Sequence, residues 1–487
     1  MEENVVFGNS KNTTEQPVAV QPAPQASSVP VSPPPPPETP SPPPSLPTHH
    51  GILGLLLKIL IPLLVLGVLV VVFITYVLPI IRNSGIVGNG APVAITYWGL
   101  WEPKEVIQPI IDEFETQNKG IKVTYEQRDI KRYKETLLTR INGGDGPDVY
   151  RFHNSWTKSM KDVLSPIPSS VITTEEFKKY YPVVQSDMVV SGGVYGIPLM
   201  MDTLVMFVND KILEDYGIGV PETWEDFTKV AGAVTVPDET GQIHTYGAAI
   251  GSYDTISRAP DILSVLFAQN RINLKEPGKA SPGSVEEALR FYTNFATGRD
   301  NFVKVWNPEG QPALEAFAGG NVAMYFGYSW DIFTVKARSP ELVFSTHKIP
   351  YLSTPITVAS YWAEGVSSKS KHQKESLLFL QFLTKKETQQ KLYTLEAKTR
   401  LFGELPARED LAAAFSDNAL LFPFLDQAKF AVSSYFVSDT HDSSVNEQLN
   451  TYLGNAVRSV LGNTSPGSAV ETLLKGVNQV LTRYGIN

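Results

Sequence analysis

The stretch Gly192–Phe227, GGVYGIPLMMDTLVMFVNDKILEDYGIGVPETWEDF, decides the fold. Its apolar run Leu199–Val208 is rich in Val, Met and Phe and is too short to span a membrane, so it predicts a buried strand. Asn209 then predicts the cap of a helix over residues 211–216, and Thr223 predicts the cap of a second helix. A strand followed by capped helices is typical of an α/β protein.

One residue of the apolar run is unusual, because Asp202 places a carboxylate among hydrophobic side chains. An ionised carboxylate that is buried without a partner is costly. We therefore expect Asp202 either to lie at an exposed edge or to be held by hydrogen-bond donors.

The chain before this stretch also alternates between strand and helix patterns. Residues 93–98, 121–125 and 148–152 predict strands, and residues 106–116 and 132–141 predict helices. This alternation predicts a parallel sheet with helices on both faces, in which ligands bind beyond the carboxyl ends of the strands. The side chains at those ends are Trp98, Trp101, Phe152, His153, Asn154 and Trp156.

Length and composition limit the classes of function. A chain of 487 residues predicts two or more lobes. The net charge is −9 and no basic block is present, so nothing in the charge favours a nucleic-acid partner. The absence of cysteine excludes disulfides, thiolate catalysis, zinc–thiolate sites and iron–sulfur clusters.

The N-terminal part predicts a membrane attachment. Residues 1–50 are dense in Pro and Ser and predict a disordered tail, either a spacer or a ligand for a proline-recognising domain. Residues 51–82 are almost free of charge and predict an uncleaved transmembrane helix. Residues 83–91 predict a flexible tether to a body over residues 92–487. The flanking charges barely encode the orientation of the helix.

Six sequence motifs follow one another between Ile95 and Asp410. They are ITYWGLW with IIDEFETQNKGIKVTYE, GDGPDVYRFHNSW, VYGIPLMMDTLVMFVNDKIL with GVPETWEDF, EAFAGGNVAMYFGYSWDIF, AEGVSSKSKHQKESLLFLQFLTKKETQQ, and ELPARED. In this order they resemble the extracellular solute-binding proteins of ABC importers, in the large family that includes the maltose-binding protein. The resemblance covers the body and none of the N-terminal part.

The resemblance implies a two-lobe periplasmic-binding-protein fold, with a hinge and a ligand cleft between the lobes. In sugar-binding members of the family, aromatic faces stack on the sugar ring while carboxylates and amides bind its hydroxyls. The positions in this chain that match such contacts are Asp202, Trp330, Trp362, Trp98, Trp101, Phe152, Trp156, Tyr361 and Glu364. A tryptophan also often packs a core, and we expect that role for Trp224 and Trp306.

Other functions have weaker support in the sequence. No nucleotide-binding, serine-hydrolase or zinc-protease motif has a convincing setting, so we expect neither an enzyme nor a cofactor. Asp439, His441 and Asp442 suggest either a metal cluster or a polar surface loop, and the loop is favoured. A glycoside hydrolase and a ligand-sensing receptor remain as alternatives.

The sequence as a whole therefore predicts a protein anchored in the cell membrane by a single helix. We expect its binding domain to lie outside the cell and its tail in the cytoplasm. Its partners are then a carbohydrate or oligosaccharide ligand and the permease of an ABC importer.

Overall fold

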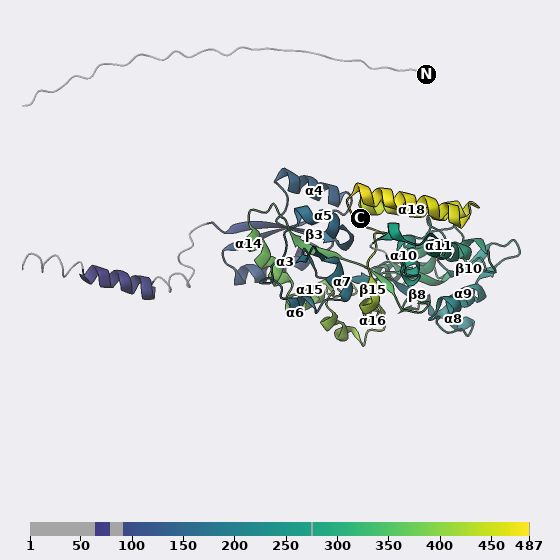
Figure 1. Cartoon of the computed structure of the whole chain (residues 1–487). Coiled ribbons are helices and arrows are strands. Elements are labelled where there is room, and N and C mark those ends of the chain that lie inside the picture. The colour runs from purple at the N-terminus through teal and green to yellow at the C-terminus, as the bar shows by residue number, and fades with distance from the viewer. Residues whose placement is uncertain (1–63, 78–90, 274–275, 487) are drawn as a thin grey trace, which may run out of the picture. The chain divides into compact units, whose positions relative to one another are not determined.

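The computed structural model describes residues 64–77, 91–273 and 276–486 (Figure 1). The chain divides into two units, Met1–Val87 and Gly88–Asn487, which are described separately.

The described part of the first unit is a single helical segment. Residues 64–72 form an α-helix that continues into a π-helical turn, η1 (Phe73–Val77). Within the described residues, no helix is long and apolar enough to cross a membrane. The predicted tail over residues 1–50, most of the predicted anchor over residues 51–82, and the tether except its last residue lie outside the described residues.

The second unit contains two lobes, and the first is built on a five-stranded sheet. Its strands, in spatial order, are β2 (Ile121–Gln127), β1 (Val93–Gly99), β3 (Val149–His153), β14 (Trp362–Val366) and β6 (Ile197–Pro198). β1 pairs in parallel with β2 and β3, as predicted. The prediction of an all-parallel sheet is wrong for β14, because this strand returns from the other lobe and runs antiparallel to β3 and β6.

Helices α3 (Lys104–Gln117) and α14 (Gln373–Leu383) pack together on this first sheet, where the rings of Phe114 and Phe379 lie 5.0 Å apart. The predicted helix over residues 132–141 is α4 (Tyr133–Gly143). The remaining helices on this side of the molecule are α5 (Thr157–Met160), α6 (Thr174–Phe177), α7 (Pro182–Asp187) and α15 (Lys386–Glu396). A small hairpin joins β4 (Val189–Val190) to β5 (Gly193–Val194).

The second lobe is built on another five-stranded sheet. Its strands, in spatial order, are β12 (Phe344–His347), β8 (Val205–Asn209), β11 (Val322–Gly327), β10 (Ile243–Ala248) and β9 (Val236–Pro237). Helices pack around it, and the C-terminal pair lies against α11 (Figure 1). These helices are α8 (Asp210–Asp215), α9 (Trp224–Ala233), α10 (Ala259–Gln269), α11 (Pro282–Thr297), α12 (Ala313–Ala318), α13 (Asp331–Arg338), α17 (Val445–Leu461) and α18 (Pro466–Arg483).

The prediction of a single strand over Leu199–Val208 is wrong. This stretch directly follows β6 of the first sheet and contributes to two further sheets, through β7 (Asp202–Thr203) and then β8. The chain leaves the first lobe here, so its backbone changes partners: the N–H of Met201 donates to Leu405 and the N–H of Leu204 donates to Val358. The stretch is therefore the first crossing between the lobes.

A three-stranded sheet forms the hinge. β13 (Thr357–Ser360) pairs antiparallel with β7 and parallel with β15 (Ala431–Val432). Each of these strands lies where the chain passes between the lobes. Near this sheet lie α16 (Phe422–Asp426) and the 3₁₀ turns η5 (Glu409–Phe415) and η6 (Ala428–Phe430).

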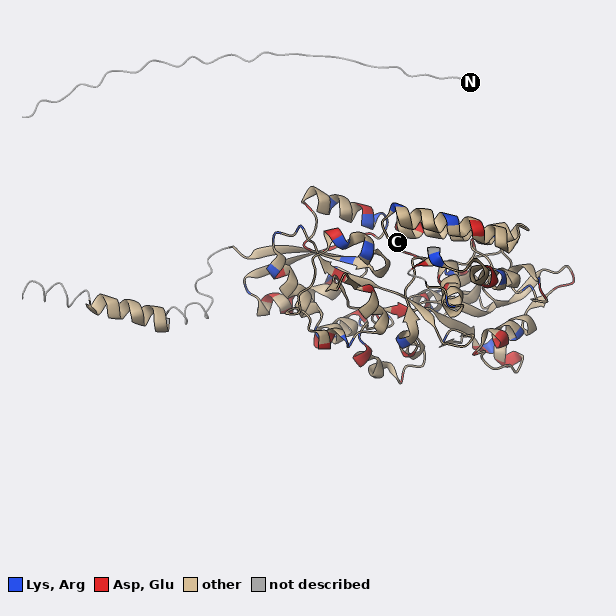
Figure 2. Ribbon diagram, in the orientation of Figure 1, with Lys and Arg blue, Asp and Glu red and all other residues tan. Residues whose placement is uncertain are grey.

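The predicted helix caps are present. The Asn209 side chain accepts a hydrogen bond from the N–H of Ile212 at the start of α8, and Thr223 accepts one from Asp226 at the start of α9. Each lobe has its own buried hydrophobic cluster. Trp224 and Trp306 belong to the core of the second lobe, as predicted. Basic and acidic residues are interspersed along the ribbon of both lobes (Figure 2).

Candidate functional site

A cavity of about 400 Å³ lies between the two lobes, against the hinge. Its walls come from the loops that follow the strands of both sheets, from the crossing strands, and from two C-terminal loops. The residues that line it are Trp101, Ile130, His153, Met200, Met201, Asp202, Trp330, Phe333, Ser360, Tyr361, Trp362, Arg400, Glu404, Ser438, Asp439 and His441.

The first lobe contributes an aromatic wall centred on Trp362, the first residue of β14. Three neighbouring rings meet it edge-on, with centroid distances of 5.0 Å for Trp156, 5.1 Å for His153 and 5.9 Å for Trp101. Trp101 lies in the loop after β1 and is 40% exposed. Tilted and edge-on ring pairs stabilise each other and fix their orientation. The indole of Trp362 is therefore rigidly held at the cavity.

The second lobe contributes Trp330, which lies where β11 turns into α13. Its ring stacks on Tyr328 with a centroid distance of 4.5 Å and an interplanar angle of 18°. The guanidinium of Arg258 lies 5.4 Å from the Trp330 centroid. Farther along α13, Phe333 stacks on Phe402 at 4.4 Å. Trp330 is thus supported on one face while it lines the cavity.

Asp202 lies on the hinge strand β7 and is 5% exposed. Its Oδ2 accepts a 2.7 Å hydrogen bond from the N–H of Ser329, and its Oδ1 accepts a 2.8 Å bond from the N–H of Thr203. Burial raises the pKa of Asp202 to about 8, although both backbone donors oppose that shift. The second of the two sequence-based expectations, a carboxylate held by donors, is confirmed.

Charged and polar groups complete the lining. Arg400 donates to Glu404 at 2.8 Å, and Asp439 is paired with Arg258, the residue before α10. The His153 ring contacts the Ser360 hydroxyl at 3.1 Å. Burial lowers the pKa of His153 to about 3, so this ring is neutral at physiological pH. The cavity therefore offers hydrogen-bond donors and acceptors between two indole faces.

Five of the nine residues matched through the resemblance line this cavity: Asp202, Trp330, Trp362, Trp101 and Tyr361. Tyr361 is only 2% exposed, and its hydroxyl donates to Asp187 at 2.7 Å. Its hydroxyl is thus already engaged within the protein.

The other four residues do not line the cavity. Trp98 is 5% exposed and is covered by the guanidinium of Arg128, 4.2 Å from the ring centroid. Phe152 is fully buried, and a Cβ at either Gly196 or Gly365 would collide with its ring. Both side chains therefore pack the first lobe.

Trp156 and Glu364 are also fully buried. The indole of Trp156 donates to Asn446 at 2.9 Å, and its ring supports Trp362 from behind. Glu364 faces its cross-strand neighbour Arg151, with 2.6 Å between the guanidinium and the carboxylate. Burial raises the pKa of Glu364, and the Arg151 charge opposes that shift.

Sequence reasoning missed several lining residues, above all Arg400 and Glu404. They lie in an irregular loop after α15, where no periodic pattern marks an inward face. For the loop over residues 439–444, the sequence favoured a polar surface loop. Asp439 and His441 are exposed and also line the cavity, whereas Asp442 forms a buried ion pair with Lys134 of the first lobe at 2.9 Å.

Two α/β lobes on a three-stranded hinge, with a cavity between them, define a protein that encloses a ligand by lobe closure. The chain belongs to the family of bacterial extracellular solute-binding proteins, which it matches over residues 109–423.

Relatives with known roles and solved structures agree with this family. The chain is 25% identical over 348 residues to a multiple sugar-binding protein of Streptococcus mutans, covering 68% of this chain and 81% of the relative. It is 23% identical over 207 residues to a maltotriose-binding protein of Pyrococcus abyssi, covering 41% of this chain and 43% of the relative.

Among solved structures, the sugar-binding protein MalE from Xanthomonas citri superposes with a TM-score of 0.66 and 21% identity. That likeness covers 80% of this chain and 98% of MalE. A cyclo/maltodextrin-binding protein complexed with maltotetraose superposes with a TM-score of 0.65 and 17% identity, over 81% of this chain and 98% of the other. At these identities the likeness shows the fold.

Proposed function

We propose that this protein captures a carbohydrate or oligosaccharide in the cavity between its lobes and delivers it to the permease of an ABC importer. The observation that carries the proposal is the placement of two indoles, Trp362 and Trp330, on opposite lobes of one cavity with the Asp202 carboxylate between them at the hinge. Aromatic faces take the apolar face of a sugar ring, while carboxylates accept from its hydroxyls. The names of the relatives, which include sugar-binding and maltotriose-binding proteins, point in the same direction.

In the proposed site, Trp330, Trp362 and Trp101 stack on the ligand. Asp202 and Glu404 accept hydrogen bonds from its hydroxyls, and Arg400 donates to its oxygens. Closing the lobes excludes water and strengthens these polar contacts. A few such contacts with stacking reach micromolar affinity, about −8 kcal/mol. No bond of the ligand is made or broken.

We further propose that the protein works at the outer face of the cell membrane. The apolar run over residues 51–82 serves as a single-pass anchor, with the Pro-rich residues 1–50 as a cytoplasmic tail and residues 83–91 as the tether. The body over residues 92–487 then stays close to the permease. Cleavage of the tether should release the body from membranes, whereas a body that is already in the soluble fraction would contradict the anchor.

The function is tested by thermal unfolding of the full-length chain against a panel of mono- and oligosaccharides. A sugar that binds the folded state adds RT ln(1 + [L]/Kd), about 2.7 kcal/mol at a hundredfold excess over Kd. We expect at least one sugar to raise Tm in this concentration-dependent way. A panel in which no sugar raises Tm would overturn the carbohydrate proposal and leave the fold unaffected.

The glycoside hydrolase alternative has a separate test. Prolonged incubation with the stabilising sugar should leave it unchanged. Release of a shorter sugar by the wild-type chain, and no release by Asp202→Asn, would instead assign hydrolase activity.

A further inference from the structure

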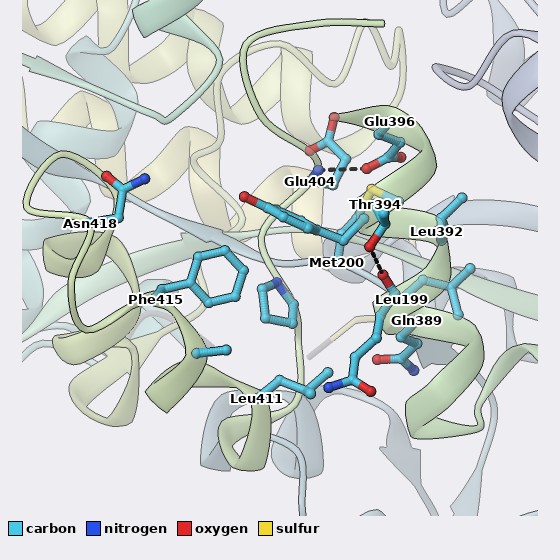
Figure 3. Close-up of a pocket in the computed structure, with 14 residues that line it drawn as sticks. Leu199, Met200, Gln389, Leu392, Thr394, Glu396, Glu404, Leu411, Phe415 and Asn418 are labelled. Atoms are coloured by element: carbon cyan, nitrogen blue, oxygen red, sulfur yellow. Dashed lines mark hydrogen bonds between the residues drawn. The ribbon is translucent and has the colours of Figure 1, made fainter. Parts of the chain in front are cut away.

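A second cavity, of about 300 Å³, shares part of its lining with the one between the lobes. Figure 3 shows the residues that line this second cavity. Helix α15 and the turn η5 form its sides, and Leu199 and Met200 close it toward the hinge. Met200 and Glu404 line both cavities. Nothing in the proposed sugar site uses the remaining residues of this second cavity.

The charges around the second cavity do not balance. Its lining includes two carboxylates, Glu396 and Glu404, and no lysine or arginine. Arg400 forms ion pairs with both carboxylates. Its guanidinium lies 3.0 Å from Glu396 Oε2 and 2.8 Å from Glu404 Oε1. The backbone N–H of Glu404 adds a 2.6 Å bond to the same Glu396 oxygen. One cation therefore faces two acids.

Two buried acceptor oxygens at this cavity have no partner. They are Glu396 Oε1 and Gln389 Oε1, on side chains that are 2% and 5% exposed. Buried polar atoms are almost always hydrogen-bonded, so a pair of orphans on one cavity wall is a sign of a missing donor. Both residues line the cavity, at positions about two turns apart on α15.

The pKa of Glu396 also reflects the shortage of positive charge around this carboxyl. Burial raises the pKa of this carboxyl to about 8, and the charges of Glu102 and Glu404 add to the shift while Arg400 opposes it. Tyr393, one turn earlier on α15, also interacts with this carboxyl. With a pKa of about 8 this carboxyl holds a proton at neutral pH, and a cation bound in the cavity would favour its ionised form.

The rest of the lining is apolar and aromatic. The rings of Tyr393 and Phe415 meet edge-on with a centroid distance of 5.0 Å, and Leu392 and Leu411 lie beside them. The side chain of Ala414 is exposed and lines the cavity from η5, so it lies at the mouth. A ligand that fits this cavity is therefore small and mostly apolar, with hydrogen-bond donors and a positive charge.

We propose that this second cavity binds a small organic ammonium ion, whose N–H groups donate to Glu396 while its apolar body lies against Tyr393 and Phe415. The site is separate from the proposed sugar site. The two sites are linked through Arg400 and Glu404, which line the cavity between the lobes. An ammonium ion at Glu396 would lie next to these two residues, on the side away from that cavity.

The probe is benzylammonium, titrated calorimetrically into the full-length chain, with benzyl alcohol and benzoate as neutral and anionic analogues of the same shape. We expect saturable one-to-one binding of benzylammonium and much weaker binding of both analogues. Glu396→Gln removes the charge and should weaken binding roughly ten- to a hundredfold. Glu387→Gln, at an exposed acid of the same helix, is the matched control and should bind like wild type.

A second variant tests the location without touching the buried acids. Ala414→Trp covers the mouth and should also weaken binding at least about tenfold, whereas Ala413→Trp, on the same turn but outside the lining, should not. No binding of benzylammonium, equal binding of benzyl alcohol, or wild-type affinity in both Glu396→Gln and Ala414→Trp would overturn the proposal. None of these results bears on sugar binding, which is measured separately.

Discussion

The carboxylate of Asp202 accepts a 2.7 Å hydrogen bond from the backbone N–H of Ser329. Asp202 lies on the hinge strand, and Ser329 immediately precedes Trp330 in the second lobe. One carboxylate therefore positions the turn that carries an indole of the cavity, while it lines the same cavity itself. A substitution at Asp202 should therefore lower both the affinity for the ligand and the stability of the hinge.

Asp202→Asn should weaken sugar binding by about two- to tenfold, because one acceptor oxygen becomes an amide NH2 group and a hydrogen bond to a neutral group is worth about 0.5–1.5 kcal/mol. The amide keeps the size of the side chain, so the fold should persist. Calorimetric titration with the sugar that raises Tm most measures the effect. Asp215→Asn, an exposed acid of α8, serves as the control, and equal losses in both variants would contradict a specific role for Asp202.

The stability of the wild-type protein should fall as pH rises from about 5 toward 8. The pKa of Asp202 is raised to about 8 by burial, so in this range the folded state holds a proton that the unfolded state has lost. With more protons bound in the folded state, the free energy of unfolding decreases with pH, by at most about 1.4 kcal/mol per unit for one proton. Urea unfolding measures the slope, which should be shallower in Asp202→Asn. Identical slopes would show that the carboxyl ionises normally.

Trp330→Ala should reduce sugar affinity by roughly ten- to a hundredfold, whereas Trp330→Phe should retain part of it, because a smaller aromatic face remains. The effect on the melting temperature without ligand should be smaller than for a core tryptophan such as Trp224, which is 1% exposed. Tyr216→Ala removes an aromatic ring that is 46% exposed and does not line the cavity, and it should bind like wild type. An unchanged affinity in Trp330→Ala would contradict the stacking role.

The ion pair between Lys134 and Asp442 should matter for stability. Lys134 Nζ lies 2.9 Å from Asp442 Oδ2, and the two side chains are 5% and 0% exposed. Burial lowers the pKa of Lys134, and the charge of Asp442 opposes that shift. Lys134→Met leaves a buried, unpaired carboxylate and should cost about 3–5 kcal/mol of unfolding free energy in urea titrations.

Replacement of both partners, Lys134→Met with Asp442→Leu, should recover much of that loss because no charge is then left unpaired. Lys211→Met, in an exposed pair with Asp215, is the control and should change stability by less than about 1 kcal/mol. A full loss in the double variant would show that the loop needs the polar contacts themselves.

Local signals in the sequence predicted local structure well. Asn209 and Thr223 cap helices because a side-chain oxygen next to its own helix needs no distant partner. The division of Leu199–Val208 between two sheets was not predictable in this way. Its cause is backbone pairing with Val358 and Leu405, far away in the chain, and apolar content alone cannot show which partner each residue takes.

For a similar reason, only some residues of the candidate site were predicted from the sequence. Trp330 lies within a recognisable motif and Trp362 directly precedes one. Both line the cavity, although whether they bind ligand stays a prediction. Glu364 lies close to Trp362 in sequence, yet strand register places it opposite Arg151 and buries it. Arg400 and Glu404 escaped notice because an irregular loop has no period from which an inward face can be read.

The central claim is that a sugar lies between Trp330 and Trp362 with a hydroxyl on Asp202. A crystal structure of the protein with the sugar that raises its Tm most tests it directly. We predict a sugar ring stacked on the Trp330 indole, with one of its hydroxyls within hydrogen-bond distance of the Asp202 carboxylate. A sugar bound outside this cavity, or inside it without contact to either residue, would contradict the account.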